Sequence, residues 1–93
     1  MTTYSIRVEL HDATWEHYYA LHEKLNKIGV VTHITADDGK NYKLPPAEYA
    51  ADTNADAQTV LNAVYGVAEG VRKNPAVFVT KSAGRMWQGL QQL

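Results

Sequence analysis

Strict alternation of apolar and polar side chains over residues 3–10 constrains the fold of this chain more than any other feature. The segment TYSIRVEL places on one face of an extended strand the apolar residues Tyr4, Ile6, Val8 and Leu10. The polar residues between them point to the opposite face. The pattern therefore predicts a half-buried strand, in a sheet with one covered face and one open face.

A helical pattern follows this strand. Between the turn at 11–14 and Gly29, apolar residues recur every three or four positions, namely Trp15, Tyr18, Leu21, Leu25 and Ile28. Either Asp12 or Thr14 can cap the first turn, by accepting a hydrogen bond from a free backbone N–H. Gly29 suits the left-handed conformation that ends many helices. We therefore expect an amphipathic helix that runs to Ile28.

The middle of the chain predicts strands around a turn. Residues 30–36 are β-branched, Asp37-Asp38-Gly39 is typical of a turn, and residues 40–44 are expected to form the second arm of a hairpin. Pro45-Pro46 interrupts any ladder, because neither residue has an N–H to donate. Residues 48–53 are expected to resume extended structure, although their alanines also suit a helix.

The second half repeats the order of helix and strand. Thr53 or Asn54 is expected to cap a helix whose apolar stripe comprises Val60, Val64, Val67 and Val71. Gly66 and Gly70 each weaken this helix by about 1 kcal/mol relative to Ala, so we expect them to permit close packing against a sheet. Residues 76–81 predict an apolar strand. Ser82 is then expected to cap a short last helix that carries Met86, Trp87 and Leu90.

This βαββαβ order predicts one ferredoxin-like α+β domain over residues 1–93. We expect a four-stranded antiparallel sheet of order 4-1-3-2, two helices on one face, and a short C-terminal helix. The open face would present Thr3, Ser5, Arg7 and Glu9. Because such a face can pack against its own copy, with Arg7 facing Glu9 across a two-fold axis, a homodimer is expected.

Composition excludes several classes of function. A chain of 93 residues is too short for a second core, and it has no cysteine, so disulfides, thiolate nucleophiles and cysteine-based zinc sites are excluded. No apolar run is long enough to cross a membrane and no apolar signal core opens the chain, so we expect a cytoplasmic protein. Phosphate-loop, dinucleotide and His-x-x-x-His patterns are missing, and neither a nucleotide cofactor nor a metal is predicted.

The histidines and cations suggest RNA chemistry. RNA supplies its own nucleophile, the 2′-hydroxyl, so cleavage needs only a base, an acid and a cation. Of the four histidines, His11 follows the first strand and His22 lies on the first helix, although ordinary surface or half-buried histidines are commoner than catalytic ones. With a net charge of −1, phosphate binding needs a local basic patch. The candidates for an RNA-binding rim are Lys40, Lys43, Arg72 and Lys73, with Lys81 and Arg85.

The open face lacks the aromatic residues on which RNA-recognition domains stack bases, because the first strand presents none outward. A different family is suggested by three features: the stretch TYSIRVEL, an aromatic-rich helix that ends near Gly29, and the segment ITADDG with the later Leu44. Together these resemble the GhoS family, small ferredoxin-like antitoxins of type V toxin–antitoxin systems, which in turn resemble small dimeric CRISPR-associated nucleases. The resemblance covers chiefly residues 3–53 and consists of pattern and element order.

The resemblance implies an endoribonuclease that cleaves a toxin messenger RNA. By position, Glu9 occupies the acidic slot near the end of the first strand, where the family pattern has Asp, and His22 falls where the antitoxin has a basic residue. Arg7 lies beside Glu9 on the same face. The second half of the chain departs from the pattern, since it is rich in alanine and glycine.

Two functions are therefore predicted. The first, which the resemblance places ahead, is a GhoS-like RNA-cleaving antitoxin with Glu9, His11 and His22 as acid–base groups and Arg7 stabilising the phosphorane. The second is a non-enzymatic interaction module of phage or plasmid type. It would bind a protein through the open sheet face or an edge strand.

Overall fold

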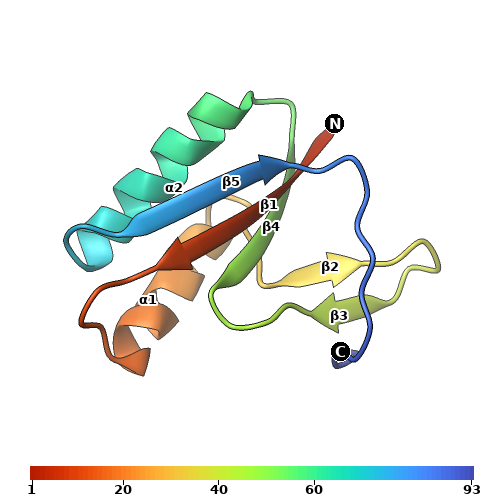
Figure 1. The fold of residues 1–93 in the computed structure, drawn as a ribbon, viewed down its shortest axis with the longest axis horizontal. Helices are drawn as coiled ribbons and strands as arrows, with labels where there is room; N and C mark the ends of the chain where they lie inside the picture. Colours follow the sequence, from red (N-terminus) through yellow and green to blue (C-terminus); the bar gives the residue numbers. More distant parts are fainter.

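A computed structural model describes residues 1–93 and shows an α+β fold with two helices (Figure 1). The elements in chain order are β1 (Thr2–Glu9), α1 (Trp15–Asn26), β2 (His33–Thr35), β3 (Asn41–Lys43), β4 (Glu48–Thr53), α2 (Ala57–Val71) and β5 (Ala76–Lys81). The α+β class and the places of both helices in the chain are thus as the periodicity predicts.

The main sheet has three antiparallel strands in the order β4-β1-β5, so the predicted four-stranded sheet is wrong. The expected fourth strand instead forms a separate hairpin, β2 with β3. Its one link to the main sheet is an isolated bridge between Val31 and Ala50, whose N–H groups donate to each other's carbonyl oxygens at 2.9 and 2.8 Å. After this bridge the chain bends at Thr32, whose carbonyl accepts from the Leu44 N–H of the other hairpin arm at 2.9 Å.

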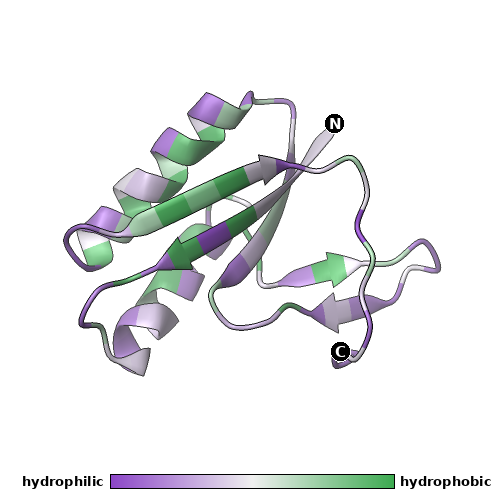
Figure 2. Cartoon of the chain, viewed as in Figure 1, coloured by the Kyte–Doolittle hydropathy of each residue, from purple (hydrophilic) through white to green (hydrophobic).

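Both helices cover the same face of the main sheet (Figure 1). The apolar residues of β1 are buried there together with Leu21 and Leu25 of α1 and with Val60, Val64 and Ala68 of α2. Arg7 and Glu9 are exposed on the opposite, open face, and the alternation of apolar and polar residues along β1 is visible in Figure 2. The division into a covered and an open face is confirmed for Arg7 and Glu9, whereas Thr3 and Ser5, also expected on the open face, are half-buried.

The ends of the helices differ in detail from the sequence expectation. Thr14 is the N-cap of α1, and its N–H donates to Nδ1 of His17 at 3.0 Å. For α2 the cap is Asp56, not Thr53 or Asn54, and its carboxylate accepts from the Thr59 N–H at 2.8 Å. That hydrogen bond lowers the pKa of Asp56. Two residues of the apolar stripe predicted for α1, Trp15 and Ile28, are 70% and 48% exposed, because Trp15 begins α1 and Ile28 lies past its end.

The predicted C-terminal helix is absent. Residues 82–93, here called the C-terminal strap, run as irregular chain from the end of β5 to the outer edge of β3, which residues 91–93 reach. The Lys43 N–H donates to the Gln91 carbonyl and the Leu93 N–H donates to the Asn41 carbonyl, both at 2.9 Å. Gly84 and Gly89 have φ values of +151° and +82°, which no right-handed helix contains. The strap therefore satisfies its backbone on the hairpin rather than within itself.

The close packing expected at Gly66 and Gly70 is also wrong, since a Cβ atom at either glycine would have no heavy atom within 4 Å. A glycine inside a helix costs about 1 kcal/mol relative to alanine. Gly66→Ala is therefore expected to raise the free energy of unfolding by about 1 kcal/mol. Urea unfolding followed by circular dichroism measures this change, and a midpoint at or below the wild-type value would contradict it.

Candidate functional site

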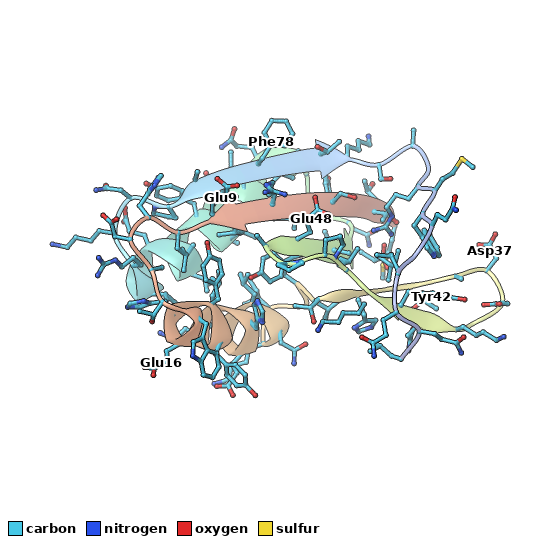
Figure 3. All side chains as sticks on the ribbon, turned by 60° about the horizontal axis from the view of Figure 1, so that its bottom comes forward. Glu9, Glu16, Asp37, Tyr42, Glu48 and Phe78 are labelled. Atoms are coloured by element: carbon cyan, nitrogen blue, oxygen red, sulfur yellow. The ribbon has the colours of Figure 1, made fainter.

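Arg7 and Glu9 lie together on the open face, as predicted, and Glu48 of β4 stands opposite Arg7 in the ladder. The Arg7 guanidinium donates to Glu9 Oε1 from Nη2 at 2.9 Å and from Nε at 3.2 Å, and its Nη1 is 3.7 Å from Glu48 Oε1. The hydrogen bonds and charge of Glu9 raise the pKa of Arg7. Figure 3 shows Glu9 and Glu48 on the same side of the sheet. Two carboxylates thus already occupy the guanidinium that was expected to stabilise a phosphorane.

A cleft of about 640 Å³ lies at the end of the molecule where β1 leads into α1 and α2 leads into β5. We call it the end cleft; its lining residues are His11, Asp12, Glu69, Gly70, Val71, Arg72, Lys73 and Asn74. Arg72 Nε donates to the His11 carbonyl oxygen at 3.2 Å and so joins the two connections. The end cleft brings together one predicted catalytic residue and two predicted RNA-binding residues.

The backbone of the end cleft is strained. Asp12 and Asn74 have φ values of +50° and +60°, in the left-handed region. Only one other non-glycine residue of the chain, Ala47 at +68°, has a positive φ. Asp and Asn adopt this conformation more readily than most residues, yet it still costs on the order of 1 kcal/mol. Strained residues of this kind concentrate at functional sites, so their presence here favours the end cleft as the site.

His22 lies on the covered side of the sheet. Its ring packs edge to face against the ring of Tyr49, with centroids 5.4 Å apart, and Tyr49 is 1% exposed in the core. The sheet therefore separates His22 from Arg7 and Glu9. Burial, and then the positive charge of Lys43, lower the pKa of His22.

The lowered pKa of His22 predicts a pH-dependent stability. Below its unfolded pKa of about 6.5 the unfolded chain binds the proton more readily than the folded chain does, so stability rises with pH in this window. The contribution is full above that pKa and is lost as the pH falls below it. We expect a larger drop in urea midpoint between about pH 7.5 and about pH 5 in the wild type than in His22→Gln. Equal drops in the two proteins would contradict the prediction.

The predicted RNA-binding rim is divided. Lys40 and Lys43 belong to the turn and second strand of the β2–β3 hairpin, whereas Arg72 and Lys73 belong to the α2–β5 connection. These two segments lie at opposite ends of a molecule whose longest extent is 38 Å (Figure 1). The four cations therefore form two separate pairs, and only the second pair lies beside a predicted catalytic histidine.

The sequence reasoning missed the exposed apolar side chains near the open face. Phe78 of β5 is 71% exposed and Met86 of the C-terminal strap is 98% exposed. Both line a groove of about 610 Å³ between the open face and the strap. The sequence pattern predicts Phe78 only as part of an apolar strand, but its place opposite Arg7 in the ladder puts it on the open face, where Figure 3 shows it.

Comparison with protein-family models and with curated proteins gives no match. No three His, Asp or Glu side chains lie close enough together to hold a metal ion. Neither helix is sufficiently long and apolar to cross a membrane.

Proposed function

We propose that the chain is a GhoS-like endoribonuclease antitoxin that cleaves a toxin messenger RNA at the end cleft, by acid–base chemistry. The observation that carries the proposal is the meeting of His11, Arg72 and Lys73 in one cleft. The resemblance of residues 3–53 to the antitoxin family supports the same reading. It is also supported by the strained backbone of Asp12 and Asn74 and by the hydrogen bond from Arg72 to the His11 carbonyl, which joins the two connections.

The chemistry needs only groups that the end cleft contains. The His11 imidazole takes the proton of a 2′-hydroxyl, the resulting oxygen attacks the adjacent phosphorus, and the bond from phosphorus to the 5′-oxygen breaks. The leaving oxygen takes a proton from the Lys73 ammonium, and the products are a 2′,3′-cyclic phosphate and a 5′-hydroxyl. Arg72 and Lys73 attract the phosphate and balance its developing charge.

A site at the end cleft gives the four predicted catalytic residues different roles. His11 becomes the principal acid–base group, and His22, which packs against Tyr49 and does not line the end cleft, is left out of the reaction. Glu9 ends β1 two residues before His11, so its carboxylate belongs to the same end of the molecule. Roles of Arg7 and Glu9 in the reaction stay predictions, because their ion pair has to open before either group can act on RNA.

Cleavage of mixed RNA by the purified protein in EDTA tests the proposal. His11→Ala is expected to lower the cleavage rate by about 100-fold or more, the usual contribution of a general base. His22→Ala is the matched control, since it removes a histidine that does not line the end cleft, and is expected to leave the rate unchanged. A wild-type protein that cleaves nothing, or a His11→Ala variant as active as the wild type, would refute the proposal.

Binding to a non-cleavable single-stranded RNA gives a second measurement. Two phosphate contacts, from Arg72 and Lys73, predict a slope of about −1.4 when log affinity is plotted against log salt concentration. Lys73→Ala is expected to bring the slope to about −0.7, whereas Lys40→Ala, at the opposite end of the molecule, is expected to leave it unchanged. Equal effects of the two substitutions would contradict a site at the end cleft.

The interaction module is the second candidate function, and the exposed Phe78 and Met86 beside the open face favour it. Exposed apolar residues that line one groove are typical of a protein-binding surface. Absence of RNA cleavage by a folded wild-type protein would favour this candidate over the first.

A further inference from the structure

The outer edge of β5 has no backbone partner. β5 pairs with β1 alone, and the Ser82 N–H donates to the Thr3 carbonyl at 2.9 Å. Since hydrogen-bonded pairs alternate in an antiparallel ladder, Ala76, Phe78 and Thr80 bond to β1 in the same way. The N–H and C=O groups of Val77, Val79 and Lys81 therefore point outward, and no hydrogen bond outside the regular elements uses them.

This edge also lacks the features that usually prevent strands from pairing between molecules. Its ladder with β1 runs without a bulge over six residues, which include no proline and only one charge, Lys81 at the end. Val77 and Val79 are half-buried on the covered side, and Phe78 is 71% exposed on the open side. The apolar colour of this strand is visible in Figure 2. An edge of this length and composition is a template for another strand.

Helix α2 continues the apolar surface below the β5 edge. Thr59 and Ala63 line a pocket with β4 and with residues 28–30, which follow α1, so that side of α2 lies toward β4 and away from β5. Helical geometry places Leu61 and Tyr65 on the opposite side of the buried stripe, toward the β5 edge. Leu61 is half-buried and Tyr65 is 38% exposed.

We propose that β5 pairs antiparallel with β5 of a second copy of the chain and so joins two sheets into one six-stranded sheet. The two-fold axis passes beside Phe78, so that Phe78 faces the partner subunit's Phe78 on the open side. Val77 then exchanges both backbone hydrogen bonds with Val79 of the partner subunit. Identical strands related by a two-fold axis thus satisfy each other's outward groups at Val77 and Val79, which makes the centre of the edge complementary to itself.

The chosen register leaves the Lys81 carbonyl without a donor, because the partner subunit's Pro75 has no N–H. One other register pairs the outward groups of Val77, Val79 and Lys81 among themselves, but it opposes unlike side chains. Directly opposed residues must point to the same face, so the alternative places Val79 against its copy. That register sets Val77 against Lys81 of the partner subunit and Phe78 against the partner's Thr80. The chosen register instead pairs aromatic with aromatic and valine with valine.

The chosen register also bears on the end cleft, in a consequence that rests on the proposed RNA function. Lys81 of one subunit lies opposite the partner subunit's Pro75, which directly follows the Arg72–Asn74 loop. The end cleft by itself carries two acidic residues, Asp12 and Glu69, against Arg72 and Lys73, and so is nearly neutral. Lys81 of the partner subunit gives it a net positive charge.

Single cysteines test the register, because the chain has none of its own. In a non-hydrogen-bonded antiparallel pair the opposed Cα atoms are about 4.5 Å apart, which allows a disulfide. Phe78→Cys is therefore expected to form a cross-linked dimer under mild oxidation. Thr80→Cys lies on the same face, but its two copies would be about 13 Å apart, so no cross-link is expected. Equal cross-linking of the two variants would overturn the register.

Sedimentation equilibrium tests the dimer itself, independently of RNA. Val79→Pro removes an outward N–H and leaves the ladder with β1 intact, and Phe78→Lys sets two ammonium groups against each other. Each is expected to weaken the dimer by about 30-fold or more with an unchanged circular dichroism spectrum, whereas Thr35→Lys, on the distant hairpin, leaves it intact. A monomeric wild type, or a dimer that both variants leave unchanged, would overturn the proposal.

The role of Lys81 is tested separately. Lys81→Ala is expected to weaken RNA binding in the dimer and to have no effect in the Val79→Pro monomer. An equal effect in both would remove the link to RNA and leave the dimer standing.

Discussion

Leu21→Ala is expected to lower the free energy of unfolding by about 2–5 kcal/mol, the usual cost of a large cavity in a core. Leu21 of α1 is 0% exposed and belongs to a cluster of 12 buried residues that joins the sheet to both helices. A small domain has only about 5–15 kcal/mol of stability in total, so this loss takes a large part of it. Thermal unfolding is expected to shift downward by about 10 °C or more.

The matched control is Ile28→Ala. Both residues belong to one apolar stripe in the sequence, seven positions apart, and only the structure distinguishes them, since Ile28 is 48% exposed. Its truncation is expected to cost less than about 1 kcal/mol. Equal losses for Leu21→Ala and Ile28→Ala would show that α1 covers the sheet over a longer stretch than described.

The strands of the main sheet could be predicted from the sequence, although not their number in the sheet, because the period of apolar side chains along a strand indicates which face is buried. The alternation along β1 placed Arg7 and Glu9 on an open face, and the strands β4 and β5 have the predicted bounds of 48–53 and 76–81. The face of β1 and the bounds of β4 and β5 both follow from which residues of a strand are covered. The residues of each strand show this by themselves, so it can be predicted from the sequence.

The β2–β3 hairpin was predicted, but its separation from the main sheet and the course of the C-terminal strap could not be predicted in this way. Residues 82–93 have apolar residues at helical spacing, but their backbone bonds to β3, some fifty positions earlier in the chain. Likewise, the β2–β3 hairpin satisfies its own backbone and leaves β4 after a single bridge. Partners so distant in sequence leave no signature in the segment itself.

Part of the candidate site, the end cleft, could be predicted from the sequence. Because β1 and β5 are antiparallel neighbours, the residue after β1 and the residues before β5 meet at one end, which brings His11 to Arg72 and Lys73. The same topology already places His22, on a covering helix, across the sheet from Glu9. The grouping of His22 with Glu9 came from the family resemblance and not from the geometry of the predicted fold.

Tyr49→Phe is expected to raise the free energy of unfolding by about 1–3 kcal/mol, although it deletes a polar group from the largest fully buried side chain. The Tyr49 hydroxyl is buried and has no hydrogen-bond partner, and burial raises its pKa. An unpartnered buried donor lowers the free energy of unfolding by about 1–3 kcal/mol, because folding removes its hydrogen bonds to water and no hydrogen bond in the protein replaces them. Phenylalanine removes that cost and keeps the ring against His22.

Tyr4→Phe provides the matched control. Tyr4 is 2% exposed, but its hydroxyl donates to the Ala55 carbonyl oxygen at 2.7 Å. Loss of this bond is expected to lower the free energy of unfolding by about 1 kcal/mol, so the same chemical change has opposite signs at two buried tyrosines. Urea unfolding of the two variants beside the wild type measures both. A Tyr49→Phe variant less stable than the wild type would mean that its hydroxyl has a partner, such as an ordered water, in the folded protein.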